Sequence, residues 1–157
     1  MFYYDVVRST TSNASAGTEN NTLRALTIAN QRACKISGLS VAARMAAAGG
    51  VILRLKTFAV AGSGGTAYTP GRRDPDAAAA ATTWFTDATA ITGGTTPVTR
   101  VMVGASAQGG FGGWFTNDPE QMLTLKPNAG ANGNAEVTNV SGLLSTNLDA
   151  AVEFAEA

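Results

Sequence analysis

Hydrophobic and polar residues alternate with a period of two along much of this chain. In the segment VILRLKTFAV, Val51, Leu53 and Leu55 fall on one face, while Arg54 and Lys56 fall on the other. This alternation is typical of a β-strand that buries one of its faces. Shorter segments have similar patterns, and the sequence predicts about eight strands, at residues 3–8, 23–29, 34–41, 51–60, 99–104, 121–127, 135–142 and 149–156.

Turn-forming clusters separate the predicted strands. AGSGGT, ITGGTTP and NAGANGN are rich in glycine and asparagine, which adopt positive φ at little cost. Many short strands with such turns between them favour an antiparallel sandwich or barrel. The long crossover helices of a parallel α/β fold are not indicated, and no repeat of fixed period suggests a propeller or solenoid. The pattern therefore predicts an all-β, antiparallel domain.

One segment departs from the alternation. In GRRDPDAAAAATTWF, Asp74 is a suitable helix cap, Pro75 suits a first turn, and the alanines at 77–81 are strong helix formers. The pattern predicts a short helix near residues 75–83. The alternative is a flexible alanine-rich linker within the domain.

The length and composition indicate one domain with a weakly charged surface. A chain of 157 residues is expected to bury about 70% of the surface that its unfolded form exposes. Charged residues make up 14%, against about 25% in typical soluble domains. The surface must then consist largely of small polar residues and alanine, which suits packing against other protein. We expect a single domain over residues 1–157, in which residues 1–20 form an ordinary first strand or an extended N-terminal arm.

The two halves of the chain carry opposite charge. Residues 1–73 contain nine basic and two acidic side chains (9 − 2 = +7), and residues 74–157 contain two basic and nine acidic ones (2 − 9 = −7). The asymmetry would complement neighbouring subunits if the halves lay apart. An interleaved sheet topology would instead mix the two charges on one surface, and we favour this interpretation.

The inventory of side chains excludes several kinds of chemistry. The chain has no histidine, so the commonest general base and transition-metal ligand are missing, and no Ser-His-Asp or Cys-His triad is available. Cys34 is the only cysteine, so no internal disulfide forms and an ordinary zinc site lacks ligands. We expect a protein that is not an enzyme and has no cofactor or metal. No signal peptide or membrane span is expected either.

Two acidic clusters offer oxygen ligands for calcium. Asp74 lies near Asp76, and Asp118 lies near Glu120 beside Asn117, but neither cluster has the spacing of a calcium loop. A helix cap at Asp74 and a turn at Asp118 are simpler explanations. A two-carboxylate glycosidase site is a further alternative, for which no particular pair of acids gives specific evidence.

The segment QGGFGGWF, residues 108–115, contains four glycines and three aromatic residues. A phosphate-binding loop requires a helix directly after the glycines, whereas this segment is followed by Asn117, Asp118 and Pro119, which form a turn. No Lys-Ser or Lys-Thr pair follows it. We therefore expect a flexible, glycine-rich end of the sandwich, whose rings either pack on the core or anchor a partner.

The candidate residues for a partner interface are aromatic or basic. The arginines at 72 and 73 occupy a proline-rich bend, where they pair either with a partner's acids or locally with Asp74 and Asp76. No basic stripe with interleaved aromatics is present, so nucleic-acid binding is not expected. The full candidate set is Phe2, Tyr3, Arg72, Arg73, Trp84, Phe111, Trp114 and Phe115.

The later part of the chain carries a recognisable order of motifs. The strand LRLKTFAV and the loop GSGGTAYTPGRRDPDAAAAATT precede a Leu-Lys-Pro-Asn segment at 125–128, a Leu-rich turn at 143–148 and a final Val- and Glu-containing strand at 151–156. Over residues 50–157 this order resembles small jelly-roll proteins encoded among the structural genes of tailed bacteriophages. The family's final strand often carries a tryptophan, where this chain has Phe154.

The resemblance implies an antiparallel jelly-roll β-sandwich of about eight strands and a function in the virion. Within that group the expected class is a capsid cement, or decoration, protein. The resemblance implies a homotrimer on the outer capsid surface that bridges subunits of the major capsid protein. The particle is expected to be assembled in the bacterial cytoplasm. By binding the assembled shell and not the separated subunits, such proteins make lattice dissociation more costly. The alternative is a tail, fibre or baseplate module that acts as a structural adaptor or binds a host glycan through Trp84 and Trp114.

Overall fold

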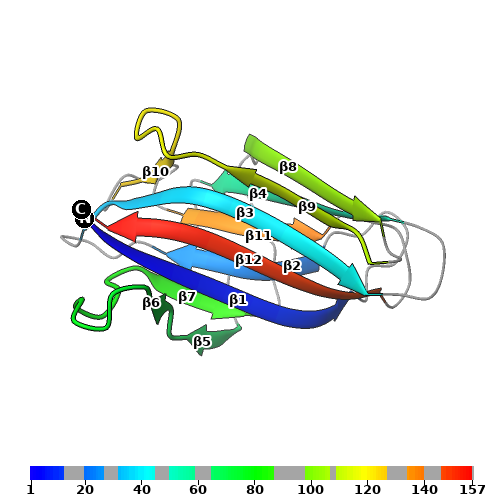
Figure 1. Cartoon of the computed structure of the whole chain (residues 1–157), viewed down its shortest axis with the longest axis horizontal. Coiled ribbons are helices and arrows are strands. Elements are labelled where there is room, and N and C mark those ends of the chain that lie inside the picture. Colours follow the sequence, from blue (N-terminus) through cyan, green and yellow to red (C-terminus); the bar gives the residue numbers. More distant parts are fainter. Residues whose placement is uncertain are drawn as a thin grey trace.

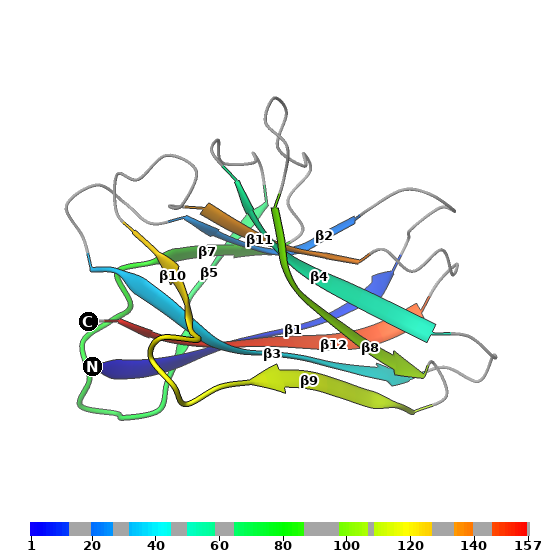
Figure 2. The ribbon, with the colours of Figure 1, turned by 90° about the horizontal axis from the view of Figure 1, so that it is seen from above.

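The chain folds into two antiparallel β-sheets that face each other (Figures 1 and 2). The computed structural model describes residues 1–12, 20–26, 32–44, 50–58, 65–86, 98–106, 109–126, 134–139 and 146–156. All regular elements in these residues are strands. The described part accordingly contains no helix with the length and apolar character needed to cross a membrane.

The first sheet, sheet A, has the strand order β10-β3-β12-β1-β6, and β9 pairs with β3 beside β10. Its strands are β1 (Phe2–Ser12), β3 (Cys34–Arg44), β6 (Gly71–Arg72), β9 (Phe111–Phe115), β10 (Leu123–Leu125) and β12 (Thr146–Glu156). The second sheet, sheet B, has the order β5-β7-β2-β11-β4-β8. Its strands are β2 (Asn20–Leu26), β4 (Gly50–Phe58), β5 (Thr66–Tyr68), β7 (Thr83–Thr86), β8 (Val98–Ser106) and β11 (Asn134–Asn139).

Eight of these strands have the connectivity of a jelly roll. Along the chain, β1, β2, β3 and β4 pair in turn with β12, β11, β9 and β8, so the first half of the chain meets the second half in reverse order. The pairs β12–β3 and β11–β4 join these into the four-stranded sheets β1-β12-β3-β9 and β2-β11-β4-β8. A long antiparallel ribbon rolled up in this way is a jelly roll. The predicted jelly-roll sandwich is confirmed, with β5, β6, β7 and β10 as additional short strands.

The rolled-up topology places the basic half of the chain beside the acidic half. Arg44 of β3 forms an ion pair with Asp149 of β12, and Arg73 forms one with Glu153 of β12. Each pair joins a base from the first half to an acid from the second. The opposite charges at the two ends of the sequence are therefore interleaved in the fold, which is the interpretation that we favoured from the sequence.

The core lies between the sheets and follows the predicted alternation. On β4, Val51, Leu53 and Leu55 are fully buried. At the end of the sandwich where the two chain termini lie (Figure 1), the ring of Phe154 packs against Tyr4 and Trp84, with a centroid separation of 5.2 Å in both cases. Cys34 is also completely buried, and this burial raises the pKa of its thiol far above the ordinary value. Its role is that of a small core side chain.

The predicted helix near residues 75–83 is wrong. Asp74 does begin a turn, because its Oδ1 accepts the N–H of Asp76 at 3.0 Å and its carbonyl accepts the N–H of Ala77 at 3.0 Å. Beyond this turn the backbone bonds to other parts of the fold. The hydroxyl of Tyr4 donates to the carbonyl of Ala78, and the carboxylate of Glu156 accepts two N–H groups further along. Short alanine-rich helices are marginal in isolation, so these tertiary bonds prevail.

Glu156 holds the alanine-rich segment against the end of β12. Its side chain is 1% exposed, and its two oxygens accept the N–H groups of Ala81 at 2.8 Å and Thr82 at 2.7 Å. Bonds from N–H groups to a buried carboxylate are among the stronger hydrogen bonds in proteins. This carboxylate thus fixes the path of the chain between β6 and β7.

Glu156→Gln should lower the free energy of unfolding by about 2 kcal/mol, because one of the two N–H groups would then face an amide donor in place of an acceptor. Urea denaturation followed by fluorescence measures the change. Glu120→Gln is the matched control, since Glu120 is exposed and the substitution there should change stability by less than about 0.5 kcal/mol. Equal stability of Glu156→Gln and wild type would show that this carboxylate does not hold the alanine-rich segment in place.

The N-terminal residues form an ordinary strand over the described range. Phe2–Ser12 pairs along its whole length with β12, and its residues Tyr4 and Asp5 also pair with β6. The alternative of an extended arm therefore does not apply to these residues. Residues 13–19 lie outside the described residues, as do most of the predicted turn clusters at 61–66, 91–97 and 128–134.

Candidate protein-interaction surface

Within the segment QGGFGGWF, the described residues 109–115 form a tight turn followed by strand β9 at one edge of the sandwich. Gly109 has a φ of 91°, a conformation that glycine adopts without strain. The N–H of Gly110 donates to the carbonyl of Ser106 at 2.9 Å, and its carbonyl accepts the N–H of Ala43 at 3.1 Å. These bonds connect the end of β8 to the start of β9, beside β3.

Gly112 allows the backbones of β8 and β9 to touch where the two sheets meet. A Cβ atom added to Gly112 would lie 1.9 Å from the carbonyl oxygen of Gly104 on β8. Figure 2 shows β8 leaving the body of sheet B and approaching β9 at this edge. The close contact closes one side of the sandwich and leaves room for no side chain at Gly112.

Gly113 and Gly38 form a floor under two exposed phenylalanine rings. Ring atoms of Phe111 and Phe115 both lie close to the position of a Cβ at Gly113, and Phe115 also lies over Gly38 on β3. The two rings point away from the core and are 67% and 52% exposed, respectively. Trp114, between them in sequence, points to the other side and packs against the core. Strand alternation thus assigns the aromatic residues of this segment to opposite faces.

These rings border the outer face of sheet A, which is built mainly of small residues. The pairing register aligns Phe111 with Ala42, Asp149 and Ser9 across β9, β3, β12 and β1. In the same way it aligns two further rows, which are Gly113 with Ser40, Ala151 and Val7, and Phe115 with Gly38, Glu153 and Asp5. Val7 is 49% exposed and Tyr3, further along β1, is 42% exposed.

Five charged groups on this face form two paired clusters. At one end, the guanidinium of Arg44 lies 3.1 Å from Asp149, which also accepts a hydrogen bond from Ser9. At the other end, Nη2 of Arg73 lies 2.8 Å from both Asp5 and Glu153, and its Nε donates to Asp5. These carboxylates hold the pKa of Arg73 above its ordinary value, principally through the hydrogen bonds to Asp5. The row of residues between these two clusters carries no charge.

The other predicted interface residues have different positions. Trp84 is 1% exposed and belongs to the core, so its assignment to an interface is corrected. The local pattern gave no sign of this, because β7 is only four residues long. Phe2 is half-buried, packs on the core and has the guanidinium of Arg32 5.5 Å from its ring centre. Arg72 and Arg73 are both exposed, and of the two it is Arg72 that lines a pocket.

The sequence interpretation missed several exposed apolar residues. Val7 on β1 belongs to the outer face of sheet A, and Ile52, Val98 and Met102 are 40–56% exposed on β4 and β8 of sheet B. Alternation within a strand could have identified such residues. Met102, for example, lies between Val101 and Val103, which pack inward, so its own side chain faces outward. An apolar residue at a strand position that faces solvent is a candidate for contact with another protein.

The two acidic clusters have local structural roles. Asp74 forms the turn described above, and Asp118 accepts the N–H of Glu120 at 2.9 Å and the side-chain amide of Gln121 at 3.0 Å. Within the described ranges, no group of three or more acidic or cysteine side chains is arranged to hold a metal ion. The geometry of these residues is therefore accounted for by turns.

Comparison of this chain with protein-family models, with curated proteins and with solved structures found no match.

Proposed function

We propose that this protein is a virion structural protein of the capsid cement class, which binds the outer surface of a phage capsid as a homotrimer. The observation that carries the proposal is the outer face of sheet A, where Phe111 and Phe115 stand exposed beside a floor of small residues. Exposed aromatic rings next to an apolar surface are typical of protein-binding hot spots. The choice of the capsid as the partner rests on the resemblance of residues 50–157 to phage jelly-roll proteins.

The electrostatics of this face suit a stable contact with protein. Burying an unpaired charge in an interface is costly, and the acids here already have basic partners within the chain. The aromatic edge at β9 and Val7 on β1 are three strand spacings apart, which is about 14 Å. We propose that this surface lies across the junction of two neighbouring subunits, so that one protein bridges them.

Bridging stabilises the shell by mass action. Each copy binds the assembled lattice in preference to the separated subunits, and the free energy of dissociation rises by the free energy of binding. The function requires recognition of a protein surface and no reaction, which agrees with a chain that has no histidine. The major capsid protein is the expected partner, and the outer capsid surface the expected location.

Electron cryomicroscopy of the intact particle tests this proposal. We expect density for this chain at regular positions on the outside of the head, with the outer face of sheet A against the major capsid protein. Particles that lack the protein should lose resistance to heat. Density in the tail alone, or particles without this chain, would refute the proposal and favour the tail-module alternative.

The alternative of a glycan-binding tail module has weaker support in the geometry. A glycan platform would require exposed aromatic rings with polar neighbours, and of the two candidates Trp84 is buried in the core and Trp114 packs against it. The two most exposed rings are the phenylalanines of β9, which offer no polar group of their own. We therefore keep protein binding as the proposed function.

A further inference from the structure

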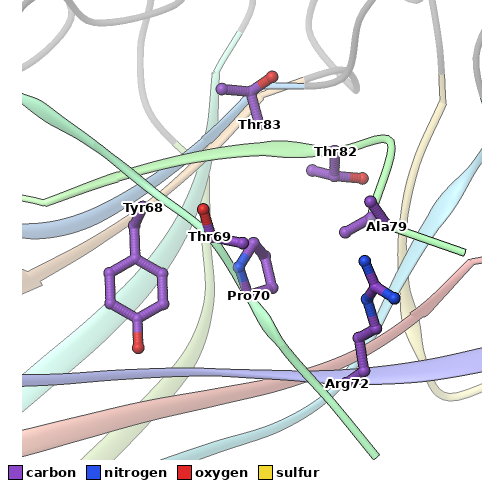
Figure 3. Close-up of a pocket in the computed structure, with 8 residues that line it drawn as sticks. Tyr68, Thr69, Pro70, Arg72, Ala79, Thr82 and Thr83 are labelled. Atoms are coloured by element: carbon purple, nitrogen blue, oxygen red, sulfur yellow. The ribbon is translucent and has the colours of Figure 1, made fainter. Parts of the chain in front are cut away.

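A pocket of about 260 Å³ lies at the end of the sandwich, away from the rings of β9. It is formed by the chain that links β5 to β6 and by the alanine-rich segment before β7 (Figure 3). Pro70, Ala79 and Ala80 give it apolar walls, and Tyr68 closes one side. Among the described residues that line it, Arg72 alone is charged, and its guanidinium points toward Ala79 and Thr82.

Arg72 differs from its neighbour Arg73 in having no carboxylate partner. The side chain of Arg73 is held by Asp5 and Glu153 on the outer face of sheet A. Arg72 is exposed and forms no ion pair with any of the described residues. The nearby Asp74 carboxylate is engaged by the N–H of Asp76. One of two adjacent arginines is thus structural, and the other offers its donors to the pocket.

The walls of this pocket are held in place by buried hydrogen bonds. Glu156 fixes the N–H groups of Ala81 and Thr82, and the hydroxyl of Tyr4 fixes the carbonyl of Ala78. The opposite wall is tied to β1, because β6 pairs with it and the N–H of Arg73 donates to the carbonyl of Tyr3 at 3.2 Å. A ligand would therefore meet a site whose shape is already formed, which reduces the entropic cost of binding.

We propose that the Arg72 pocket binds the acidic side chain of a partner protein. The planar guanidinium matches a carboxylate through two parallel hydrogen bonds. The apolar walls at Pro70, Ala79 and Ala80 suit the methylene stem of a glutamate. The proposal does not depend on the capsid function, because it concerns the isolated chain and a different surface from the outer face of sheet A.

Nuclear magnetic resonance titration of the ¹⁵N-labelled protein tests this site. The probes are the blocked tripeptides acetyl-Gly-Glu-Gly-amide and acetyl-Gly-Gln-Gly-amide, with N-acetylneuraminate as an acidic sugar. We expect the glutamate peptide to shift the amide signals of Arg72, Ala79 and Ala80 in a saturable manner. The glutamine peptide should have at least ~10-fold lower affinity, because it lacks the charge-assisted bonds.

Variants at two arginines complete the test. Arg72→Gln should reduce the affinity for the glutamate peptide at least ~10-fold. Arg44→Gln should leave the affinity unchanged, because Arg44 lies at the end of β3, whereas the start of β3 pairs with Glu156 near the C-terminus. Equal effects of the two peptides, or full binding by Arg72→Gln, would overturn the proposal. Tighter binding of the acidic sugar at the same amides would also overturn it, in favour of a carbohydrate ligand.

Discussion

Replacing both Phe111 and Phe115 with serine should abolish decoration of capsids and leave the sandwich folded. The two rings are the most exposed aromatics on the outer face of sheet A. Central aromatic anchors commonly contribute about 2 kcal/mol or more each to protein binding. Loss of both should therefore weaken binding by about 4 kcal/mol, which corresponds to roughly a thousandfold in Kd. Co-sedimentation of purified protein with undecorated, expanded capsids measures this change.

Met102→Ser is the matched control for this experiment. Met102 is 56% exposed, as much as the phenylalanines, but it belongs to β8 of sheet B. Its replacement removes an exposed apolar side chain from the other sheet and should leave capsid binding unchanged. A double phenylalanine variant that is folded, by its circular dichroism and thermal transition, and that binds with wild-type affinity would show that this face does not contact the capsid.

Much of the fold could be predicted because seven of the eight jelly-roll strands have clear alternation. The exception is β9, whose sequence FGGWF contains two glycines. Glycine has low strand propensity, and its presence suggests a loop. Here the glycines are required by contacts from elsewhere in the chain, namely the backbone of Gly104 and the ring of Phe115. A local pattern carries no information about such long-range contacts.

The candidate site could be predicted only in part, because it too depends on contacts between residues that are far apart in the sequence. Once FGGWF is known to be a strand, alternation places Phe111 and Phe115 on one face and Trp114 on the other. Without that knowledge the three aromatics are equivalent. The different roles of Arg72 and Arg73 likewise depend on Asp5 and Glu153, which lie far away in sequence and close together in the sheet.

The failure of the helix prediction has a related cause. Alanine propensity and the cap at Asp74 favour a helix by only small amounts per residue. The buried carboxylate of Glu156 and the hydroxyl of Tyr4 each bind a specific backbone group of this segment. Tertiary hydrogen bonds of this kind outweigh propensity in a segment of fewer than ten residues. The chain path that results also builds one wall of the Arg72 pocket.

Gly112→Ala should be the most destabilising of the single substitutions considered for this chain. The new methyl group would lie 1.9 Å from the carbonyl oxygen of Gly104, a backbone atom that has no alternative rotamer. The contact is relieved only if β8 and β9 separate, so we expect a loss of about 3 kcal/mol in the free energy of unfolding. In a domain of this size that lowers the Tm by about 6–12 °C.

Gly50→Ala provides the control for this substitution, because Gly50 is also a strand residue that lies next to a backbone carbonyl. A Cβ at Gly50 would lie 3.5 Å from the carbonyl oxygen of Ala105, which is an ordinary van der Waals contact. Calorimetry should therefore find a near-native Tm for Gly50→Ala and a strongly reduced one for Gly112→Ala. If both variants melted with the wild type, β8 and β9 would not be in backbone contact, and the closed edge that supports Phe111 and Phe115 would have to be abandoned.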